Sequence, residues 1–317
     1  TSKRCSKRSK ESKRSEERSE PFRRHKSNAE NKSAFDFFSF NMKLCRFRLH
    51  DDPTPRSGLF HDGHYYETDG QQPIGIYKPD DVTLLAPISR PPTIRDFMSF
   101  EQHVLNTRKK FGREGVQREW YEAPAYFYLN PLTIFGPDEP VEKPSFTDEF
   151  DFELEVAVVI GASGKDIEVE EADSHILGFT ILNDWTLRDV QRREARTGLG
   201  YAKSKDTATS IGPYLVTPDE LESRIISTDN GAHYNLEMKV ILNGDLIGGG
   251  NLRDMHWTFA QMISQASKSS LVAVGDVIAS GTVGTGSLLE QERGYLKPGD
   301  EVVLQVERLG ELRSRII

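Results

Sequence analysis

Carboxylate side chains in two apolar stretches carry the strongest chemical signal in this chain. Glu153 and Glu155 are two residues apart in the first stretch, and Asp184 ends the second. Carboxylates that point into a covered space repel one another and lose hydration, so they need a cation or a proton nearby. These ligands are hard oxygen donors, with neither Cys nor His among them. They therefore favour Mg²⁺, Mn²⁺ or Ca²⁺ over zinc or copper.

The stretch that carries the first two acids is predicted to be a β-strand over residues 151–160. Its apolar residues recur with period 2, which is typical of a strand. One face would hold Phe152, Leu154, Val156 and Val158, and the other Asp151, Glu153, Glu155, Ala157 and Val159. Because the second face turns apolar at its far end, we expect both faces to be covered there. A half-solvated strand with one charged face is the alternative interpretation. Residues 178–182 predict a second strand, which delivers Asp184.

An imidazole is expected on a helix that begins near residue 99. Ser99 followed by Gln102 has the spacing of a capping box, and Phe100, His103 and Val104 would share the inner face. A lone His on such a face is more often a hydrogen-bonded core residue than a functional group. Asp96, just before the helix, also has the simple interpretation of a solvated cap.

The remaining pattern is mainly β, with turns that the residues mark clearly. Asp62-Gly63 and Asn243-Gly244 predict hairpins, because both pairs suit turns with positive φ. A helix is expected over residues 259–270 and strands over 301–307 and 311–317. The glycine-rich residues 280–287 lack the Gly-Lys-Ser/Thr ending of a phosphate-binding loop, so nucleotide binding is rejected.

Composition predicts a globular protein with an atypical beginning. The chain has 317 residues, a formal charge of −8 and 36% hydrophobic residues, which allows one large core or two domains. No apolar stretch is long enough for a membrane helix. Two cysteines give no disulfide framework, so we expect a cytoplasmic location.

Three segments are expected, and the first is strongly basic. Residues 1–41 hold twelve Lys and Arg against six acids, have almost no apolar residues before Phe35, and are predicted to be a disordered extension. Residues 42–88 predict a small β-rich domain, and a proline-rich connection leads to a catalytic domain over 89–317. A nucleic-acid-binding arm is the other interpretation of 1–41, but the acidity of the rest argues against nucleic acid as a partner.

Taken together, these motifs resemble the fumarylacetoacetate hydrolase family from about residue 84 to the C-terminus. The signature comprises Phe152-Glu153-Leu154-Glu155, Asn183-Asp184-Trp185, Arg188-Asp189 with Gln191, Lys203-Ser204, Asp206-Thr207, Ile211-Gly212-Pro213 and Ser280-Gly281-Thr282. The resemblance implies an α+β, mainly β fold, a fumarylacetoacetase-like mixed β-sandwich roll, usually as a homodimer. Three residues depart from the family pattern: Met98, Ala202 and Lys205 stand where Tyr, Gly and an aromatic residue are common.

The resemblance also assigns roles to residues. Asp96, Glu153, Glu155 and Asp184 match metal ligands. His103 matches the general base and Glu290 the acid that orients it. Arg188, Gln191, Lys203 and Thr282 match substrate-contacting positions, and Lys203 is expected to act in catalysis by stabilising an oxyanion or the departing carbanion. The departures leave the metal ligands intact and affect the identity of the substrate.

The reaction that this resemblance implies is hydrolysis of a carbon–carbon bond in a 1,3-diketo acid of the fumarylacetoacetate or acylpyruvate type, as in aromatic amino acid catabolism. A small diketo acid would be the partner, with Mg²⁺ as cofactor, or else Mn²⁺ or Ca²⁺. Family relatives instead decarboxylate β-keto acids, or isomerise and hydrate unsaturated acids. A third interpretation is a metal-stabilised binding protein without turnover. The His103 and Glu290 pair favours hydrolysis among these.

Overall fold

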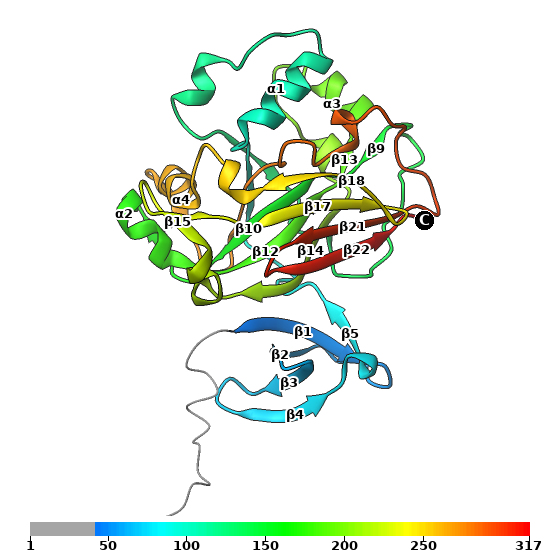
Figure 1. Ribbon diagram of the computed structural model, residues 1–317, viewed down its shortest axis with the longest axis vertical. Helices are drawn as coiled ribbons and strands as arrows, with labels where there is room; N and C mark the ends of the chain where they lie inside the picture. The colour runs from blue at the N-terminus through cyan, green and yellow to red at the C-terminus, as the bar shows by residue number, and fades with distance from the viewer. Residues whose placement is uncertain (1–41) are drawn as a thin grey trace, which may run out of the picture. The chain divides into compact units, whose positions relative to one another are not determined.

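The computed structural model describes residues 42–317, shown as ribbons in Figure 1. The prediction for residues 1–41 lies outside the described residues. The fold is mainly β, as the sequence predicted, and one large sheet organises it. This sheet has the strand order β4-β3-β2-β1-β14-β12-β10-β20-β6-β7, with β5 paired to β1 and β8 paired to β14.

The centre of the sheet carries the two strands predicted around the acids, β10 and β12, together with strands that were not predicted there. They are β6 (Ile94–Phe97), β7 (Tyr126–Leu129), β8 (Ile134–Phe135), β10 (Leu154–Ile160), β12 (Ile176–Asp184), β14 (Thr209–Val216) and β20 (Val277–Ala279). The single strand expected over 151–160 is divided, because Asp151 belongs to the short strand β9 (Phe150–Asp151). β9 pairs with β13 (Thr186–Leu187) outside the large sheet. Glu153 therefore lies at a break between two strands.

The N-terminal strands extend the same sheet. They are β1 (Lys43–Leu49), β2 (Arg56–His61), β3 (His64–Thr68), β4 (Pro73–Tyr77) and β5 (Val82–Leu85). The predicted hairpin at Asp62-Gly63 joins β2 to β3, and both residues have positive φ. Lys43 and Leu44 pair with Val216 and Leu215 of β14, so these strands share backbone hydrogen bonds with the centre of the sheet.

A second sheet covers one face of the first and makes the main core. Its order is β18-β17-β21-β22, from β17 (Glu237–Leu242), β18 (Asp245–Asn251), β21 (Glu301–Val306) and β22 (Gly310–Arg315). Figure 1 shows these strands across β10, β12 and β14. Val156 and Val158 pack into the core that contains Met238 and Val240, whereas Ala157 and Val159 belong to a separate core. The prediction that this strand is covered on both faces is confirmed.

The remaining elements are short. The helices are α1 (Glu101–Lys110), α2 (Val169–Ala172), α3 (Arg188–Glu194) and α4 (Phe259–Ser267), and the small strand pairs are β11 (Gly164–Lys165) with β19 (Leu271–Val272) and β15 (Ile225–Ser227) with β16 (His233–Tyr234).

The helix predicted near residue 99 is α1, but the expected capping box is absent. Phe100 is the N-cap, without a side-chain cap, and Ser99 Oγ donates instead to the Ser280 carbonyl at 2.5 Å. The reason is tertiary: β6 and β20 are neighbouring parallel strands, and the end of β20 brings an acceptor to Ser99.

Candidate metal and substrate site

Strand pairing brings three distant carboxylates together. Glu155 lies on β10 and Asp184 ends the antiparallel neighbour β12. Asp96 lies on β6, which reaches β10 through β20. One carboxylate oxygen from each of the three lies within 4.8 Å of the others, and all three residues are buried. The sequence therefore supplied three converging oxygen ligands from segments far apart in the chain.

Glu153, the fourth expected ligand, borders this cluster but is already paired with cations. Its Oε1 lies 2.7 Å from Arg188 Nη2, and its Oε2 lies 2.5 Å from Lys205 Nζ. Burial raises the pKa of Glu153, but the charges of Arg188 and Lys205 outweigh burial, so the pKa is lowered overall. Glu153 is thus held ionised by the protein itself.

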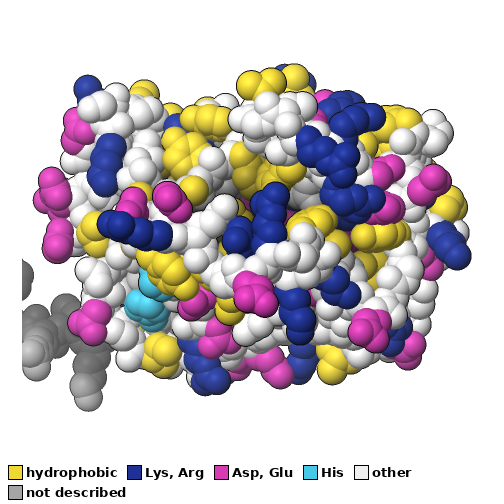
Figure 2. All heavy atoms as spheres, turned by 90° about the horizontal axis from the view of Figure 1, so that it is seen from above, with side chains coloured by type: hydrophobic (Ala, Val, Ile, Leu, Met, Phe, Trp, Pro, Cys, Tyr) yellow, Lys and Arg dark blue, Asp and Glu magenta, His cyan; other side chains and the backbone are white. Residues whose placement is uncertain are grey.

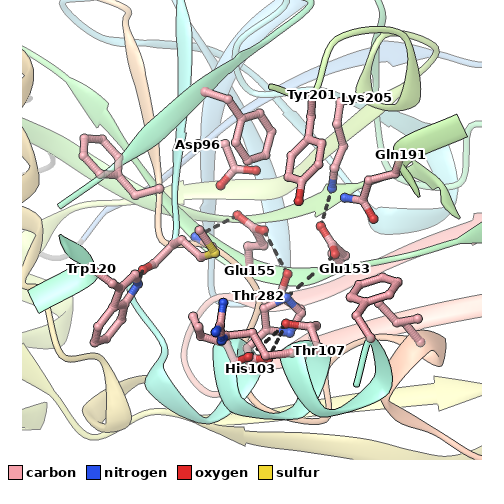
Figure 3. A pocket seen from close by; sticks show the side chains of 18 of the residues that line it. Asp96, His103, Thr107, Trp120, Glu153, Glu155, Gln191, Tyr201, Lys205 and Thr282 are labelled. Atoms are coloured by element: carbon pink, nitrogen blue, oxygen red, sulfur yellow. Dashed lines mark hydrogen bonds and ion pairs between the residues drawn. The ribbon is translucent and has the colours of Figure 1, made fainter. Parts of the chain in front are cut away.

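Lys203, the expected catalytic lysine, does not reach the cluster, whereas Lys205 does. Lys203 Nζ lies 2.8 Å from Asp206 Oδ2, and its side chain is half exposed. Lys205 is buried and bridges Glu153 to Asp184, and it also donates to Thr186 Oγ1 at 2.6 Å. Figure 3 shows Lys205 pointing toward Glu153.

A tight turn explains why Lys205 rather than Lys203 reaches the acids. Residues Lys203–Lys205 form a 3-10 turn, and the Glu194 carboxylate accepts the backbone N–H groups of Lys203 and Ser204. The turn therefore presents the side chains at positions 203 and 205 to different surroundings. The sequence contained one signal, since Lys205 replaces an aromatic residue common in the family, but it did not show the direction of the side chain.

The acid cluster carries more negative charge than its protein partners balance. Asp96 Oδ1 and Asp184 Oδ1 are buried and accept no hydrogen bond from residues 42–317. Burial raises the pKa of Asp96 to about 6, and burial together with the neighbouring acids raises the pKa of Glu155 well above its ordinary value. Burial likewise raises the pKa of Asp184, although Lys205 opposes it. Unsatisfied, converging oxygens of this kind fit a hard divalent cation.

An imidazole–carboxylate pair stands beside the acids. His103 on α1 places Nδ1 3.0 Å from Glu290 Oε2, and its Nε2 lies 4.0 Å from Glu153 Oε1. Glu290 is itself fixed by Asn106 Nδ2 at 2.9 Å and by the Thr285 N–H at 3.0 Å. Burial lowers the pKa of His103, but the charge of Glu290 more than compensates and the pKa rises overall. Glu290 therefore orients the ring, and Nε2 is left to face the cavity.

Arg188, expected to hold a substrate carboxylate, is used within the protein. Its Nε donates to Asp151 Oδ2 at 2.7 Å and its Nη1 to Gln191 Oε1 at 3.1 Å, while Nη2 contacts Glu153. Each of the three nitrogens therefore faces a protein acceptor. Asp151, which the sequence interpretation left without a role, also accepts the backbone N–H groups of Leu288 and Leu289. Arg188 and Asp151 thus hold Glu153 in place.

Thr282 and Gln191, which were predicted to contact substrate, line the cavity. The neighbouring Gly281 N–H donates to Glu155 Oε2 at 3.0 Å. Gly281 has a φ of +78°, and a Cβ there would lie 2.2 Å from the Phe97 carbonyl oxygen. The glycine-rich turn therefore serves close packing around a carboxylate, because only glycine fits this backbone.

The cavity above the acids has a volume of about 180 Å³. Asp96, Glu153, Glu155, Lys205 and Tyr201 line it and are labelled in Figure 3, and Arg108 and Arg113 also line it. Figure 2 looks onto this side of the molecule and shows Lys and Arg side chains gathered near the middle of the face. No helix within residues 42–317 is long and apolar enough to cross a membrane.

Comparisons with known proteins agree with this arrangement. Residues 93–317 match the family model described as fumarylacetoacetate (FAA) hydrolase, C-terminal, and residues 42–87 match one described as Rv2993c-like, N-terminal. A similar curated protein is the mitochondrial oxaloacetate tautomerase fahd2 of Xenopus laevis, 28% identical over 88% of this chain and 91% of that protein. Another is the oxaloacetate tautomerase YisK of Bacillus subtilis, which is 31% identical over 76% of this chain and 75% of that protein.

Among solved structures, the chain is similar to the 5-carboxymethyl-2-hydroxymuconate delta-isomerase of Mycobacterium smegmatis. The TM-score is 0.69 at 25% identity, and the match covers 87% of this chain and 98% of the other. A fumarylacetoacetate hydrolase of Exiguobacterium antarcticum is similar to the same degree, with a TM-score of 0.69 at 25% identity over 87% of this chain and 99% of the other. The two curated relatives thus carry the names of tautomerases, and the two solved structures those of an isomerase and a hydrolase.

Proposed function

Because this chain belongs to the fumarylacetoacetate hydrolase family, we propose that it is a divalent-metal-dependent tautomerase that interconverts the enol and keto forms of a small 2-oxo acid of the oxaloacetate type. The observation that carries this proposal is the cluster of Asp96, Glu155 and Asp184 beside the His103–Glu290 pair. The names of the two curated relatives, both oxaloacetate tautomerases, also support proton transfer rather than bond cleavage.

Asp96, Glu155 and Asp184 would hold the ion, which is Mg²⁺ in this proposal, with Mn²⁺ or Ca²⁺ as substitutes. A bound divalent ion would polarise the substrate carbonyl and stabilise enolate charge. Glu153 stands in contact with the cluster but keeps its ion pairs with Arg188 and Lys205. We therefore propose that Glu153 balances the charge of Lys205 and is not one of the metal ligands.

His103 would carry the proton. Its Nδ1–H faces Glu290, so Nε2 is the basic nitrogen on the cavity side. In the ketonising direction Nε2 takes the proton of the enol O–H, the electron pair of that bond re-forms the carbonyl, and the alkene carbon then takes the proton from the imidazolium, which returns to neutral imidazole. In the reverse direction Nε2 removes that proton from carbon. Glu290 stabilises the imidazolium between the two steps.

The test is to follow the loss of enol oxaloacetate by its ultraviolet absorbance, with Mg²⁺ and with a chelator in its place. We expect faster ketonisation than with Mg²⁺ alone, and loss of this acceleration with the chelator. The His103→Ala protein, with Mg²⁺, controls for catalysis by the ion. If that variant accelerates the reaction as much as the unchanged protein, the proposal is wrong.

Hydrolysis of a diketo acid is the second candidate, because the His103–Glu290 pair also suits activation of water. His103 would take a proton from water, the hydroxide would add to a carbonyl carbon, and the carbon–carbon bond would break with its electrons passing to an enolate, which is then protonated. Incubation with acetylpyruvate distinguishes the candidates. Release of pyruvate and acetate at rates above those of oxaloacetate ketonisation would make the chain a hydrolase.

A homodimer is part of this proposal. Tyr128, Leu132 and Leu199 are exposed hydrophobic residues, more than half accessible in the single chain. Burying such side chains in an interface is favourable. Light scattering during gel filtration should give twice the mass of one chain, and a monomer at micromolar concentration would contradict it.

A further inference from the structure

The turn that follows β20 contains a backbone conformation that is unusual for its residue type. Thr285 has a φ of +67°, in the left-handed region that β-branched residues avoid. Within residues 42–317 it is the only β-branched residue with a positive φ. Glycine, which adopts this conformation readily, stands on both sides of it, at Gly284 and Gly286. Because Thr285 is exposed, packing in the core does not explain why a threonine occupies this position.

The hydroxyl of Thr285 joins this turn to the second sheet. Oγ1 donates to the Gly249 carbonyl at 2.8 Å and accepts the Gly249 N–H at 3.1 Å. Both hydrogen-bonding functions of the hydroxyl are therefore used by one residue of β18. Gly248 permits the close approach, because a Cβ there would lie 2.2 Å from the Thr285 carbonyl oxygen. A glycine at position 285 would fit the backbone but could not make these two hydrogen bonds.

The backbone of Thr285 reaches the carboxylate that orients the imidazole. Its N–H donates to Glu290 Oε1 at 3.0 Å, while the Ser287 hydroxyl donates to Glu290 Oε2, also at 3.0 Å. Oε2 is the oxygen that faces His103 Nδ1. Burial raises the pKa of Glu290, but the charge of His103 and the hydrogen bonds, that of Thr285 among them, lower the pKa overall. One residue thus connects β18 with the imidazole–carboxylate pair.

The other contacts of Glu290 come from the helix that carries the imidazole. Asn106 Nδ2 donates to Glu290 Oε1, and Gln102 Nε2 donates in turn to Asn106 Oδ1 at 2.7 Å. Both residues lie on α1 with His103, so these contacts would move together with the ring. They cannot by themselves fix the ring relative to the acids on the large sheet. The hydroxyl of Thr285 supplies an attachment outside α1.

We propose that Thr285 is a positioning residue for the proton carrier. Its hydroxyl anchors the turn on β18, its N–H holds Glu290, and Glu290 faces Nδ1 of His103 so that Nε2 is directed at the cavity. The role of His103 as proton carrier comes from the proposed function, on which this inference rests. The strained backbone follows from the need for a hydroxyl and an N–H at the same position, and such strain is typical of residues that serve a site.

Three substitutions separate the hydroxyl from the backbone. Thr285→Val keeps the β-branched shape without the hydroxyl, Thr285→Gly suits the backbone without the hydroxyl, and Thr285→Ser keeps the hydroxyl. We expect Thr285→Val and Thr285→Gly to lower kcat for ketonisation of enol oxaloacetate by about tenfold, since misplacing a catalytic group by about 1 Å can cost roughly 10²-fold. KM should change little, and Thr285→Ser should stay close to the unchanged protein.

A second measurement does not depend on turnover. Proton NMR of protein labelled with nitrogen-15 histidine detects the Nδ1–H of His103 that faces Glu290, as a proton shielded from exchange with water. Its absence from His103→Ala assigns the signal. We expect the signal in the unchanged protein and in Thr285→Ser, and its loss by exchange in Thr285→Val and Thr285→Gly.

The matched control is Ser269→Gly. Ser269 is exposed, has a φ of +51° and donates its N–H to the Asp166 carboxylate, so it shares the backbone features of Thr285. Neither Ser269 nor Asp166 lines the cavity. This variant should keep both kcat and the His103 signal. Thermal unfolding checks that every variant is folded.

The outcomes separate this inference from the proposed reaction. Unchanged kcat and NMR signal in Thr285→Val, full activity of Thr285→Gly, or equal losses in Thr285→Val and Thr285→Ser overturn the role of the hydroxyl. A lower kcat with the His103 signal retained overturns the connection through Glu290. Loss of the signal in Thr285→Val, without ketonisation by the unchanged protein, keeps the positioning role and overturns the tautomerase.

Discussion

Two groups of charged residues at and beneath the cavity, here called its wall and its floor, are built from similar residues and differ in how their charges are balanced. On the wall, Asp151 and Glu153 face Arg188, and Glu290 faces His103. On the floor, Asp96, Glu155 and Asp184 face one another, and Lys205 is the cation in contact, touching Asp184.

The difference shows that the polypeptide balances the charge of the wall with its own cations and leaves part of the charge of the floor to a bound ligand. Removing a carboxylate from water is costly unless a partner compensates. The wall meets this cost with its own arginine and histidine. The floor meets it only in part, as the raised pKa values of Asp96 and Glu155 indicate. A divalent cation would complete the floor.

Removing a carboxylate from the floor should have the largest effect. Asp184→Ala takes away a ligand, so Mg²⁺ binding should disappear and kcat should fall by about a thousandfold or more, since a metal Lewis acid contributes several kcal/mol. Calorimetry with Mg²⁺ and the ketonisation assay measure the two effects. Asp206→Asn, an acid outside the cluster, is the control and should bind Mg²⁺ normally. Turnover by Asp184→Ala in metal-free buffer would refute the ligand assignment.

Substitutions of His103 and Glu290 in the wall should lower kcat without weakening the binding of Mg²⁺. His103→Ala should lower kcat by about 10²- to 10⁴-fold, the usual contribution of a general acid–base. Its Mg²⁺ affinity should stay close to that of the unchanged protein, because His103 is not among the three converging ligands. Glu290→Gln should lower kcat less, since the ring remains. An unchanged kcat in His103→Ala would place the proton carrier elsewhere.

Removing the arginine that pairs with the wall carboxylates should destabilise the protein more than removing a charge from the floor. Arg188→Met leaves Asp151 without its cation and Glu153 with Lys205 alone, and breaking a buried pair costs about 3–5 kcal/mol. Asp96→Asn, by contrast, should stabilise the metal-free protein, because it removes a buried charge with no ion pair. Urea unfolding in the presence of a chelator compares the two. If both variants lose stability equally, the floor is already balanced.

The same contrast predicts that the stability of the metal-free protein and that of the Mg²⁺-bound protein depend on pH in opposite directions. The pKa of Asp96 is raised to about 6 in the folded protein, so its protonated form favours folding, and that stability is lost as the pH rises through 6. The metal-free protein should therefore unfold at a lower temperature at pH 7.5 than at pH 5. Saturating Mg²⁺ should reverse this order, because the ion binds ionised carboxylates. A metal-free protein that is more stable at pH 7.5 would contradict the prediction.

Substitution of Lys203 should have the smallest effect, and the same substitution at Lys205 is the comparison. Lys203→Met should change stability by no more than about 0.5 kcal/mol, as surface substitutions do, and leave kcat within about twofold. Lys205→Met should alter both, because it unpairs Glu153 and Asp184. Steady-state kinetics and thermal unfolding of the two variants measure this difference. A loss of activity confined to Lys203→Met would restore the role that family resemblance gave to Lys203.

Much of the fold followed from local patterns. The period-2 alternation around Val156 and Val158 identified a strand covered on both faces, and Asn243-Gly244 marked the turn between β17 and β18, with positive φ at both residues. The break before β10 was missed, because Asp151 and Glu153 fit the alternation equally well. The capping box at Ser99 was wrong, since an acceptor from a distant strand captured the hydroxyl.

The amino-acid sequence by itself determined the types of group available: oxygen ligands for a hard cation, one imidazole and a carboxylate to orient it. Only the tertiary structure decided that Lys205 rather than Lys203 reaches the acids, and that Arg188 is occupied by Asp151 and Glu153. The physical reason is that residue spacing specifies the face of a regular strand or helix. The direction of a side chain in a tight turn, and the partner that neutralises a buried charge, depend on segments brought together by folding.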